Sequence, residues 1–131
     1  MSVEHQNAER LLRGFGAFIQ RDLEALHELF ADDVRWEVPG RSVLAGTYVG
    51  VEDVLAMLGR TLELSGGTYR TDLRFVLADD ENAVASYRAT GARGGKQLDL
   101  DQLLVCRFAG ERIAEVRALP VDQAVFDAFW G

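Results

Sequence analysis

The side chains that could perform acid–base chemistry are few in this chain and far apart. His27 is one of two histidines, and it shares a predicted helix face with Leu23 and Phe30. This spacing predicts an inward position, with a hydrogen-bonded core histidine as the first interpretation and a general base as the second. Asp99 and Asp101 share one face of a predicted strand, and paired carboxylates can act as acid and base. The other face of that strand is apolar, so we expect both aspartates to face solvent or an interface.

Gln102 is a polar residue on a strand face that is otherwise apolar. That face consists of Leu98, Leu100, Leu104 and Cys106. A contact to a bound molecule and a hydrogen bond to neighbouring backbone are equally good interpretations of Gln102. The strand over residues 83–93 alternates only weakly between polar and apolar residues, so two sets of residues could face inward. One set is Ser86, Arg88 and Thr90, and the other is Ala85, Tyr87 and Ala89. An inward Arg88 would be a buried cation in need of an acidic partner or an anionic ligand, whereas an inward Tyr87 would supply a phenol.

No group of residues has the spacing of a metal site or a cofactor site. The two histidines are far apart, and Cys106 is the one cysteine, which also excludes an internal disulfide. The glycine pairs stand at predicted turns and match neither a phosphate-binding loop nor a dinucleotide fingerprint. We therefore expect no metal and no cofactor.

Length and charge narrow the class of protein. The 131 residues predict a single domain, residues 1–131, large enough to bury a core. The net charge is −7, with 21 acidic against 14 basic residues, which argues against a nucleic-acid or anionic-membrane partner because both require a basic face. The sequence shows no signal peptide and no membrane-spanning run, which predicts a cytoplasmic location.

Hydrophobic periodicity predicts three helices, then four strands and a short last helix. The helices are expected over residues 4–20, from Asp22 to the Asp32-Asp33 pair that ends the second helix, and over 51–64, with a short strand at 34–38 between the last two. Further strands are expected at 69–77, 83–93, 96–108 and 112–119, and a final helix after Asp122 has Val125, Phe126, Phe129 and Trp130 on its apolar side. This order is typical of an α+β fold with an antiparallel sheet that curves around the first helix.

Two glycines interrupt the first predicted helix, Gly14 and Gly16. A glycine in a helix interior costs roughly 1 kcal/mol relative to alanine. Either another part of the chain approaches that face closely, or the helix simply tolerates them.

Three segments carry a family resemblance: LFADDVRWEVPG, LAGTYVGVEDV and RFAGERIAEVRAL. Together with the order of elements, they resemble the nuclear transport factor 2-like superfamily, in its SnoaL-like and ketosteroid isomerase-like branch. The similarity covers nearly the whole chain. The resemblance implies a cone-shaped sheet with a mostly apolar pocket. The superfamily includes isomerases, polyketide cyclases, epoxide hydrolases, dehydratases and non-catalytic binding proteins, so the resemblance implies a pocket and no particular reaction.

The isomerase branch uses an aspartate base on the first strand and an oxyanion hole made of a tyrosine and a protonated acid. In this chain the three positions fall on Val38, Gly14 and Leu104. The last-strand aspartate of the epoxide hydrolase branch falls on Ala118. None of these side chains can transfer a proton, so the resemblance implies that this protein is not a steroid isomerase of the usual type.

The same resemblance gives an expected pocket lining. The residues are Phe15, Phe18, Trp36, Val38, Tyr48, Tyr87, Leu104, Val116, Ala118 and Phe126, with His27, Arg88 and Gln102 as candidate catalytic residues. Trp36 alternates with Val34 and Val38, so it lines the pocket or belongs to the plain core. Tyr48 follows a bend and is expected to bring its hydroxyl to the cavity mouth.

With this resemblance, the leading hypothesis is a small-molecule enzyme or binding protein of the SnoaL-like kind. Its ligand is expected to be apolar and cyclic or aromatic, and its chemistry to be acid–base, such as isomerisation, cyclisation or dehydration. The alternative is a non-catalytic dimeric module that binds a ligand or a partner protein. Residues 103–106 are apolar on both strand faces, which predicts a homodimer built through the sheet, with Glu115 and Arg117 available to pair across it.

Overall fold

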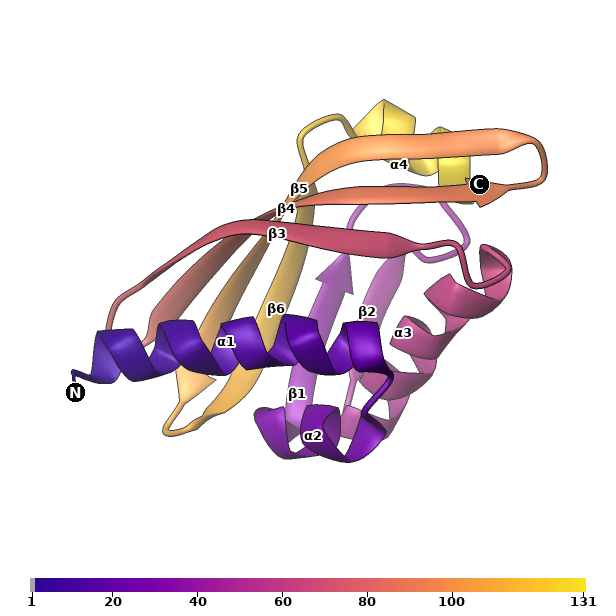
Figure 1. Cartoon of the computed structure of the whole chain (residues 1–131). Helices are drawn as coiled ribbons and strands as arrows, with labels where there is room; N and C mark the ends of the chain where they lie inside the picture. Colours follow the sequence, from indigo (N-terminus) through magenta and orange to yellow (C-terminus); the bar gives the residue numbers. More distant parts are fainter. Residues whose placement is uncertain (1) are drawn as a thin grey trace.

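The computed structural model describes residues 2–131 as one curved sheet with four helices (Figure 1). The elements are α1 (Val3–Gln20), α2 (Leu23–Leu29), β1 (Phe30–Val38), β2 (Gly46–Val49), α3 (Val51–Leu64), β3 (Arg70–Ala78), β4 (Asn82–Arg93), β5 (Lys96–Ala109), β6 (Arg112–Pro120) and α4 (Gln123–Trp130). The strand order across the sheet is β2-β1-β6-β5-β4-β3. This architecture confirms the predicted α+β class.

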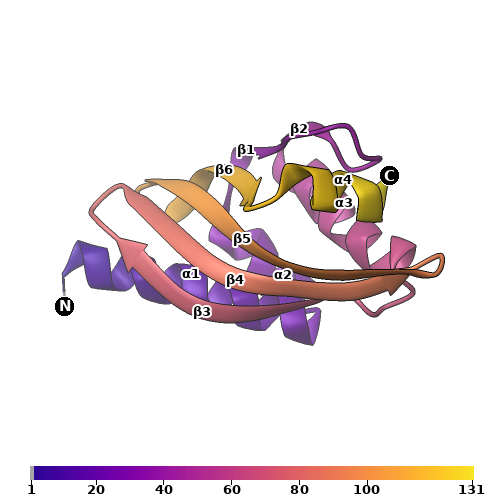
Figure 2. The ribbon, with the colours of Figure 1, turned by 90° about the horizontal axis from the view of Figure 1, so that it is seen from above.

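The sheet bends around α1, which lies along its concave side (Figures 1 and 2). Register shifts in the β1–β6, β3–β4 and β5–β6 pairings accompany this bend, and such irregularities increase the local twist of a strand. The core fills the space between the concave face and the helices. Among residues 2–131, none of the helices combines the length and the hydropathy that crossing a membrane requires.

The two glycines of α1 have different surroundings. A Cβ atom added to Gly14 would lie 2.5 Å from Leu29 Cδ2, so the glycine allows the end of α2 to pack closely against α1. A Cβ atom at Gly16 would meet nothing within 4 Å, so simple tolerance explains that position. The helix ends at Arg21, whose φ of 56° is left-handed, and Asp22 then caps α2 by accepting a hydrogen bond from the Ala25 amide.

The end of the second helix was predicted too late. Helix α2 stops at Leu29, and Phe30 begins β1, so Asp32 and Asp33 belong to the strand. The reason is tertiary, because Phe30 pairs with Ile113 of β6 and its ring packs edge-on against Trp36 at 6.0 Å between centroids. These contacts outweigh the local helical pattern.

Two features of the first strands differ from the expected antiparallel sheet. Strand β1 pairs with β6 in parallel, and its other edge pairs with β2, in which Tyr48 lies opposite Trp36. Strand β2 was not predicted, because four residues that begin with Gly46 are too few to show an alternation. The parallel pairing joins segments far apart in the chain, which local patterns do not report.

Strand β3 reverses its faces part-way along. In the sequence, the odd positions from 69 to 77 are largely apolar and the residues between them charged, which predicts one inward face for this strand. Tyr69, Thr71 and Leu73 are half-buried as this predicts, but Phe75 is 52% and Leu77 65% exposed. A register shift between Leu73 and Phe75 moves the later side chains to the other face, because the side-chain period of a strand is two residues. The apolar side of α4 is likewise narrower than predicted, since Val125 is exposed.

Candidate ligand-binding site

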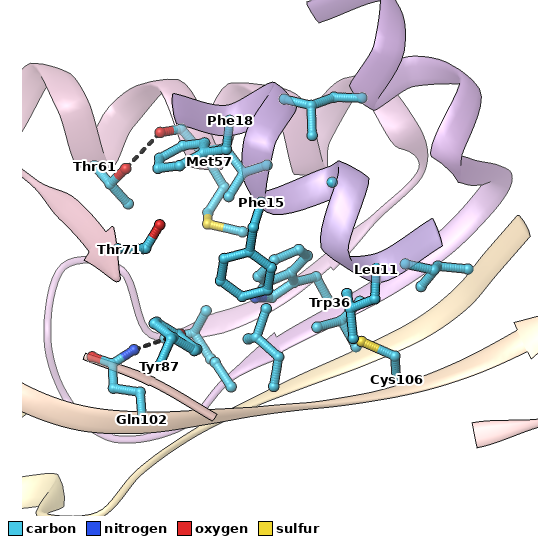
Figure 3. A pocket seen from close by; sticks show the side chains of 18 of the residues that line it. Leu11, Phe15, Phe18, Trp36, Met57, Thr61, Thr71, Tyr87, Gln102 and Cys106 are labelled. Carbon is cyan, nitrogen blue, oxygen red and sulfur yellow. Dashed lines mark hydrogen bonds between the residues drawn. The ribbon is translucent and has the colours of Figure 1, made fainter. Parts of the chain in front are cut away.

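The concave face of the sheet, α1 and α3 enclose a cavity with about 100 Å³ of room for the centres of water-sized molecules (Figure 3). Most of its lining is apolar and aromatic. The lining residues are Leu11, Gly14, Phe15, Phe18, Leu26, Leu29, Phe30, Trp36, Val38, Leu44, Met57, Leu58, Thr61, Tyr69, Thr71, Tyr87, Gln102, Leu104, Cys106, Ile113, Val116, Ala118, Phe126 and Trp130.

Nine of the ten residues expected in the pocket line this cavity. They are Phe15, Phe18, Trp36, Val38, Tyr87, Leu104, Val116, Ala118 and Phe126. The indole of Trp36 is 8% exposed and alternates along β1 with the buried Val34 and Val38. Both of the alternatives for Trp36 therefore apply, since its ring packs against Phe30 and also faces the cavity.

Tyr48 does not line the cavity. Its hydroxyl donates a hydrogen bond of 2.7 Å to the backbone oxygen of Leu44, so the side chain secures the loop before β2. The expected position at the cavity mouth was wrong, because the side chain of Tyr48 shares its sheet face with its partner Trp36 but lies on an edge strand that the cavity does not reach.

His27 lies away from the cavity, contrary to its expected inward position. Arg88 lies away from it as well, which decides between the two faces left open for its strand. His27 is exposed, and its Nε2 lies 3.2 Å from Glu52 Oε1. Leu23, which was predicted to share an inward helix face with His27, is 62% exposed. The short helix α2 packs on the core through Leu26, the residue before His27.

Strand β4 presents alanines and Tyr87 to the inside, which turns Arg88 to the outer face. There the guanidinium makes a two-point ion pair with Asp99, through Nε to Oδ1 at 2.6 Å and Nη2 to Oδ2 at 2.5 Å. This hydrogen-bonded partner holds the pKa of the Asp99 carboxyl below its usual range. Asp101 lies on the same face and pairs with Arg74 at 3.1 Å, as expected for solvated aspartates.

The polar atoms of the cavity belong to neighbouring strands of the inner face. Tyr87 and Gln102 are direct cross-strand partners, and Gln102 Nε2 donates a hydrogen bond of 2.7 Å to the Tyr87 hydroxyl. Gln102 is only 2% exposed, and its Oε1 has no hydrogen-bond partner among residues 2–131. Thr71 Oγ1, on β3, is the other buried side-chain atom without a partner in this part of the chain.

None of the lining residues in the described chain is an acid, a histidine, a lysine or an arginine. Burial raises the pKa of Tyr87 well above its ordinary value, and the nearby phenol of Tyr69 raises it further. Burial also raises the pKa of Tyr69, and it raises the pKa of the Cys106 thiol to about 12. These groups stay protonated at neutral pH, so they can donate hydrogen bonds but cannot accept a proton from a bound molecule.

The family model for the SnoaL-like domain matches residues 8–116. The chain belongs to the SnoaL-like family. It is 39% identical over 119 residues to an uncharacterized protein of Mycobacterium tuberculosis (strain H37Rv), an alignment that covers 90% of this chain and 91% of the relative. Among solved structures, Bal32a from a soil-derived mobile gene cassette is 37% identical with a TM-score of 0.96 and covers 99% of this chain and 100% of its own.

A nuclear transport factor 2-like protein from Burkholderia xenovorans LB400 superposes with a TM-score of 0.84 at 19% identity, over 98% of both chains. At this identity the likeness concerns the fold. It agrees with the expected nuclear transport factor 2-like fold, including the curved sheet.

The positions that the resemblance equates with catalytic residues of the isomerase and epoxide hydrolase branches surround the cavity of this SnoaL-like protein. Gly14, Val38, Leu104 and Ala118 all belong to the lining. The fold therefore places them where chemistry would occur, and the side chains present there offer no proton donor or acceptor.

The remaining polar residues of the lining were only partly predictable from the sequence. Tyr69 and Thr71 stood on the predicted inward face of their strand, yet neither entered the expected site, because a threonine within an apolar alternation carries no chemical signature. Met57, Thr61 and Trp130 also line the cavity. The Thr61 hydroxyl donates to the Leu58 backbone oxygen at 2.6 Å and is thus already engaged.

Proposed function

We propose that this SnoaL-like protein binds a small, mostly apolar cyclic molecule in the cavity and does not catalyse acid–base chemistry with its own side chains. The observation that carries the proposal is the lining, which is aromatic and aliphatic with a few hydrogen-bonding groups and has no ionisable group that titrates near neutral pH. Ligand sites in proteins commonly have this composition. Of the two functions that the sequence left open, the geometry supports binding.

The size of the cavity limits the ligand. At roughly 10–15 Å³ per water on this measure, about 100 Å³ holds roughly seven water molecules. One or two fused rings fit this room better than a long chain. The aromatic walls suit a flat molecule, because Phe15, Tyr87 and Trp36 present rings from three different elements.

A second function is catalysis by hydrogen bonding alone, in an isomerisation, cyclisation or dehydration. The neutral phenols of Tyr69 and Tyr87 support it, because a protonated phenol can stabilise negative charge that develops on a substrate oxygen. Such a substrate would need to lose its proton to water or to a group of its own. Product formation that depends on Tyr87→Phe would favour this function over simple binding.

The proposal includes a homodimer formed through the outer face of the sheet. The register brings apolar residues together there in two rows across β3, β4, β5 and β6, with charged residues beside them. The apolar residues are Phe75, Leu77, Val84, Leu103, Val105 and Leu119. Glu115 already pairs with Arg107 at 3.2 Å and Arg117 with Glu37 at 3.6 Å within the chain, so the apolar rows supply the contact. A second copy of the chain is the proposed cover, with no nucleic acid or membrane partner, and a cytoplasmic location is part of the proposal.

A thermal-shift screen with small cyclic compounds tests the binding function. A ligand at 100 times its Kd stabilises the fold by about 2.7 kcal/mol, which raises Tm by roughly 10 °C for a domain of this size. The variant Ala118→Leu extends a side chain into the cavity and should abolish the shift while the protein stays folded. The same change at the exposed Ala109 is the control and should preserve it. Equal shifts in both variants would contradict binding in the cavity.

A further inference from the structure

The unpartnered polar atoms of the cavity lie at one end of it. In Figure 3, Thr71, Tyr87 and Gln102 lie on one side, and Leu11 and Cys106 on the other. The register agrees, since Tyr87 lies opposite Gln102 and next to the Leu73 position, two residues along β3 from Thr71. The cavity therefore has a polar end and an apolar end.

The side-chain amide of Gln102 is held in an orientation that leaves its Oε1 atom without a hydrogen-bond donor. The amide nitrogen is held by the Tyr87 hydroxyl at 2.7 Å, and the ring of Tyr87 is held in turn by an edge-on contact with Phe15 at 5.1 Å between centroids. Leaving a buried amide oxygen without a donor costs about 1–3 kcal/mol. A residue that fills space alone would not carry this cost, since leucines occupy the equivalent positions at Leu100 and Leu104.

A second hollow adjoins this polar end. Its lining is Phe18, Ile19, Arg21, Leu62, Gly67, Tyr69, Arg70 and Thr71. Phe18, Tyr69 and Thr71 belong to both hollows, so Thr71 lies where the two meet. A molecule that enters by this route passes the polar end, so its leading part reaches the apolar end and its trailing group stays beside Thr71.

We propose that the ligand carries a hydroxyl group on its ring, and that this group donates a hydrogen bond to Gln102 Oε1 or Thr71 Oγ1 at the polar end of the cavity. This inference rests on the proposed binding function and adds the chemistry that the site selects. A hydroxyl suits both atoms, because the amide oxygen only accepts whereas the threonine hydroxyl accepts and donates. A ligand without a donor leaves the Gln102 oxygen unsatisfied.

Three probes of nearly equal shape test the inference: 2-naphthol, 2-methoxynaphthalene and naphthalene, titrated by calorimetry at pH 7. The wild type should bind 2-naphthol about tenfold more tightly than either of the others, which corresponds to about 1.4 kcal/mol. In Thr71→Val and in Gln102→Leu, the ratio of the 2-naphthol affinity to the affinity of the other probes should fall toward one. Thr71→Ser keeps the hydroxyl and should retain the preference. The matched controls are Thr90→Val on the outer face and Gln97→Leu at the exposed start of β5, and both should retain the preference.

Each other outcome has a definite meaning. Equal affinity for the three probes would overturn the inference, since it would show that water satisfies the polar end regardless of the ligand. Tighter binding of 2-methoxynaphthalene would also overturn it, because the site would then be a donor toward the ligand. A preference that survives both Thr71→Val and Gln102→Leu would place the selecting group elsewhere. Binding of none of the probes would instead refute the proposed function itself.

Discussion

Replacing Trp36 by alanine separates the contribution of the indole to the core from its contribution to the cavity. An indole buries roughly 200 Å², which is worth about 5 kcal/mol at about 25 cal/mol per Å². Trp36 is almost fully buried, but one side of its ring faces the cavity and has no packed partner there. We therefore expect Trp36→Ala to lose about 3 kcal/mol of unfolding free energy, the lower end of the range for such changes.

The assay is urea denaturation combined with titration of a naphthalene probe. Trp36→Ala should lose both stability and most of its probe affinity, and Trp36→Phe should keep most of each. Phe129→Ala is the matched control, because Phe129 is equally buried but outside the cavity lining. It should lose a similar amount of stability and bind the probe normally in the folded state. A Trp36→Ala protein that binds the probe as the wild type does would refute the assignment of Trp36 to the ligand site.

Three further predictions concern other parts of the molecule. Light scattering at micromolar concentration should give twice the chain mass, and Leu103→Lys, on the outer sheet face, should halve it; a monomeric wild type would contradict the proposed dimer. Turnover of a β,γ-unsaturated ketosteroid should be negligible, and Val38→Asp should restore little, because Gly14 and Leu104 supply no oxyanion donor; robust wild-type turnover would overturn this. Stability should fall as pH rises above about 9, since the raised pKa of Cys106, Tyr69 and Tyr87 keeps these groups protonated in the fold while the unfolded chain ionises. Urea midpoints from pH 7.5 to 10.5 measure that fall, Cys106→Ala should reduce it near pH 9, and a flat profile would count against it.

The direction of the pH effect follows from where the protons are bound. Between the unfolded thiol pKa of 9.0 and the folded value of about 12, the native state holds a proton that the unfolded state has lost. The stabilisation is complete below pH 9 and decreases as pH rises through this window.

Strong periodicity made several elements predictable from the sequence. The apolar stripe of α1, with Leu11 and Phe15, and the strict alternation of β5 both appear in the structure as expected. Because the side chains of a strand alternate, the inward position of Gln102 followed from its leucine neighbours. The prediction of a strongly curved sheet came from the resemblance to known proteins. This curvature places Trp36 and Val38 beside the cavity.

Strand β4 shows why the remainder was not predictable. Its inward residues are Ala83, Ala85, Tyr87 and Ala89, and alanine carries too little hydrophobic signal to mark a buried face. Small side chains fit there because α1 lies close to this strand, as the contact between Phe15 and Tyr87 shows. The choice between Arg88 and Tyr87 therefore depended on a helix packed against the strand, which no local pattern contains.

The register shift in β3 and the parallel pairing of β1 with β6 were also not predictable, because both depend on contacts between strands and not on the local sequence. One register shift between Leu73 and Phe75 exposes two large apolar residues that the alternation had placed inside. Strand partners far apart in the chain decide such shifts. The unpartnered oxygen of Gln102 is also a property of the assembled site, because it depends on where Tyr87 holds the amide.

A crystal structure of the protein with 2-naphthol would test the proposed function through a single observation. We expect density for one bicyclic ring system inside the cavity, against Trp36 and Phe15, with its hydroxyl oxygen about 2.5–3.0 Å from Gln102 Oε1 or Thr71 Oγ1. A cavity that holds only water, or a naphthol bound elsewhere on the surface, would contradict the account of this cavity as a ligand-binding site.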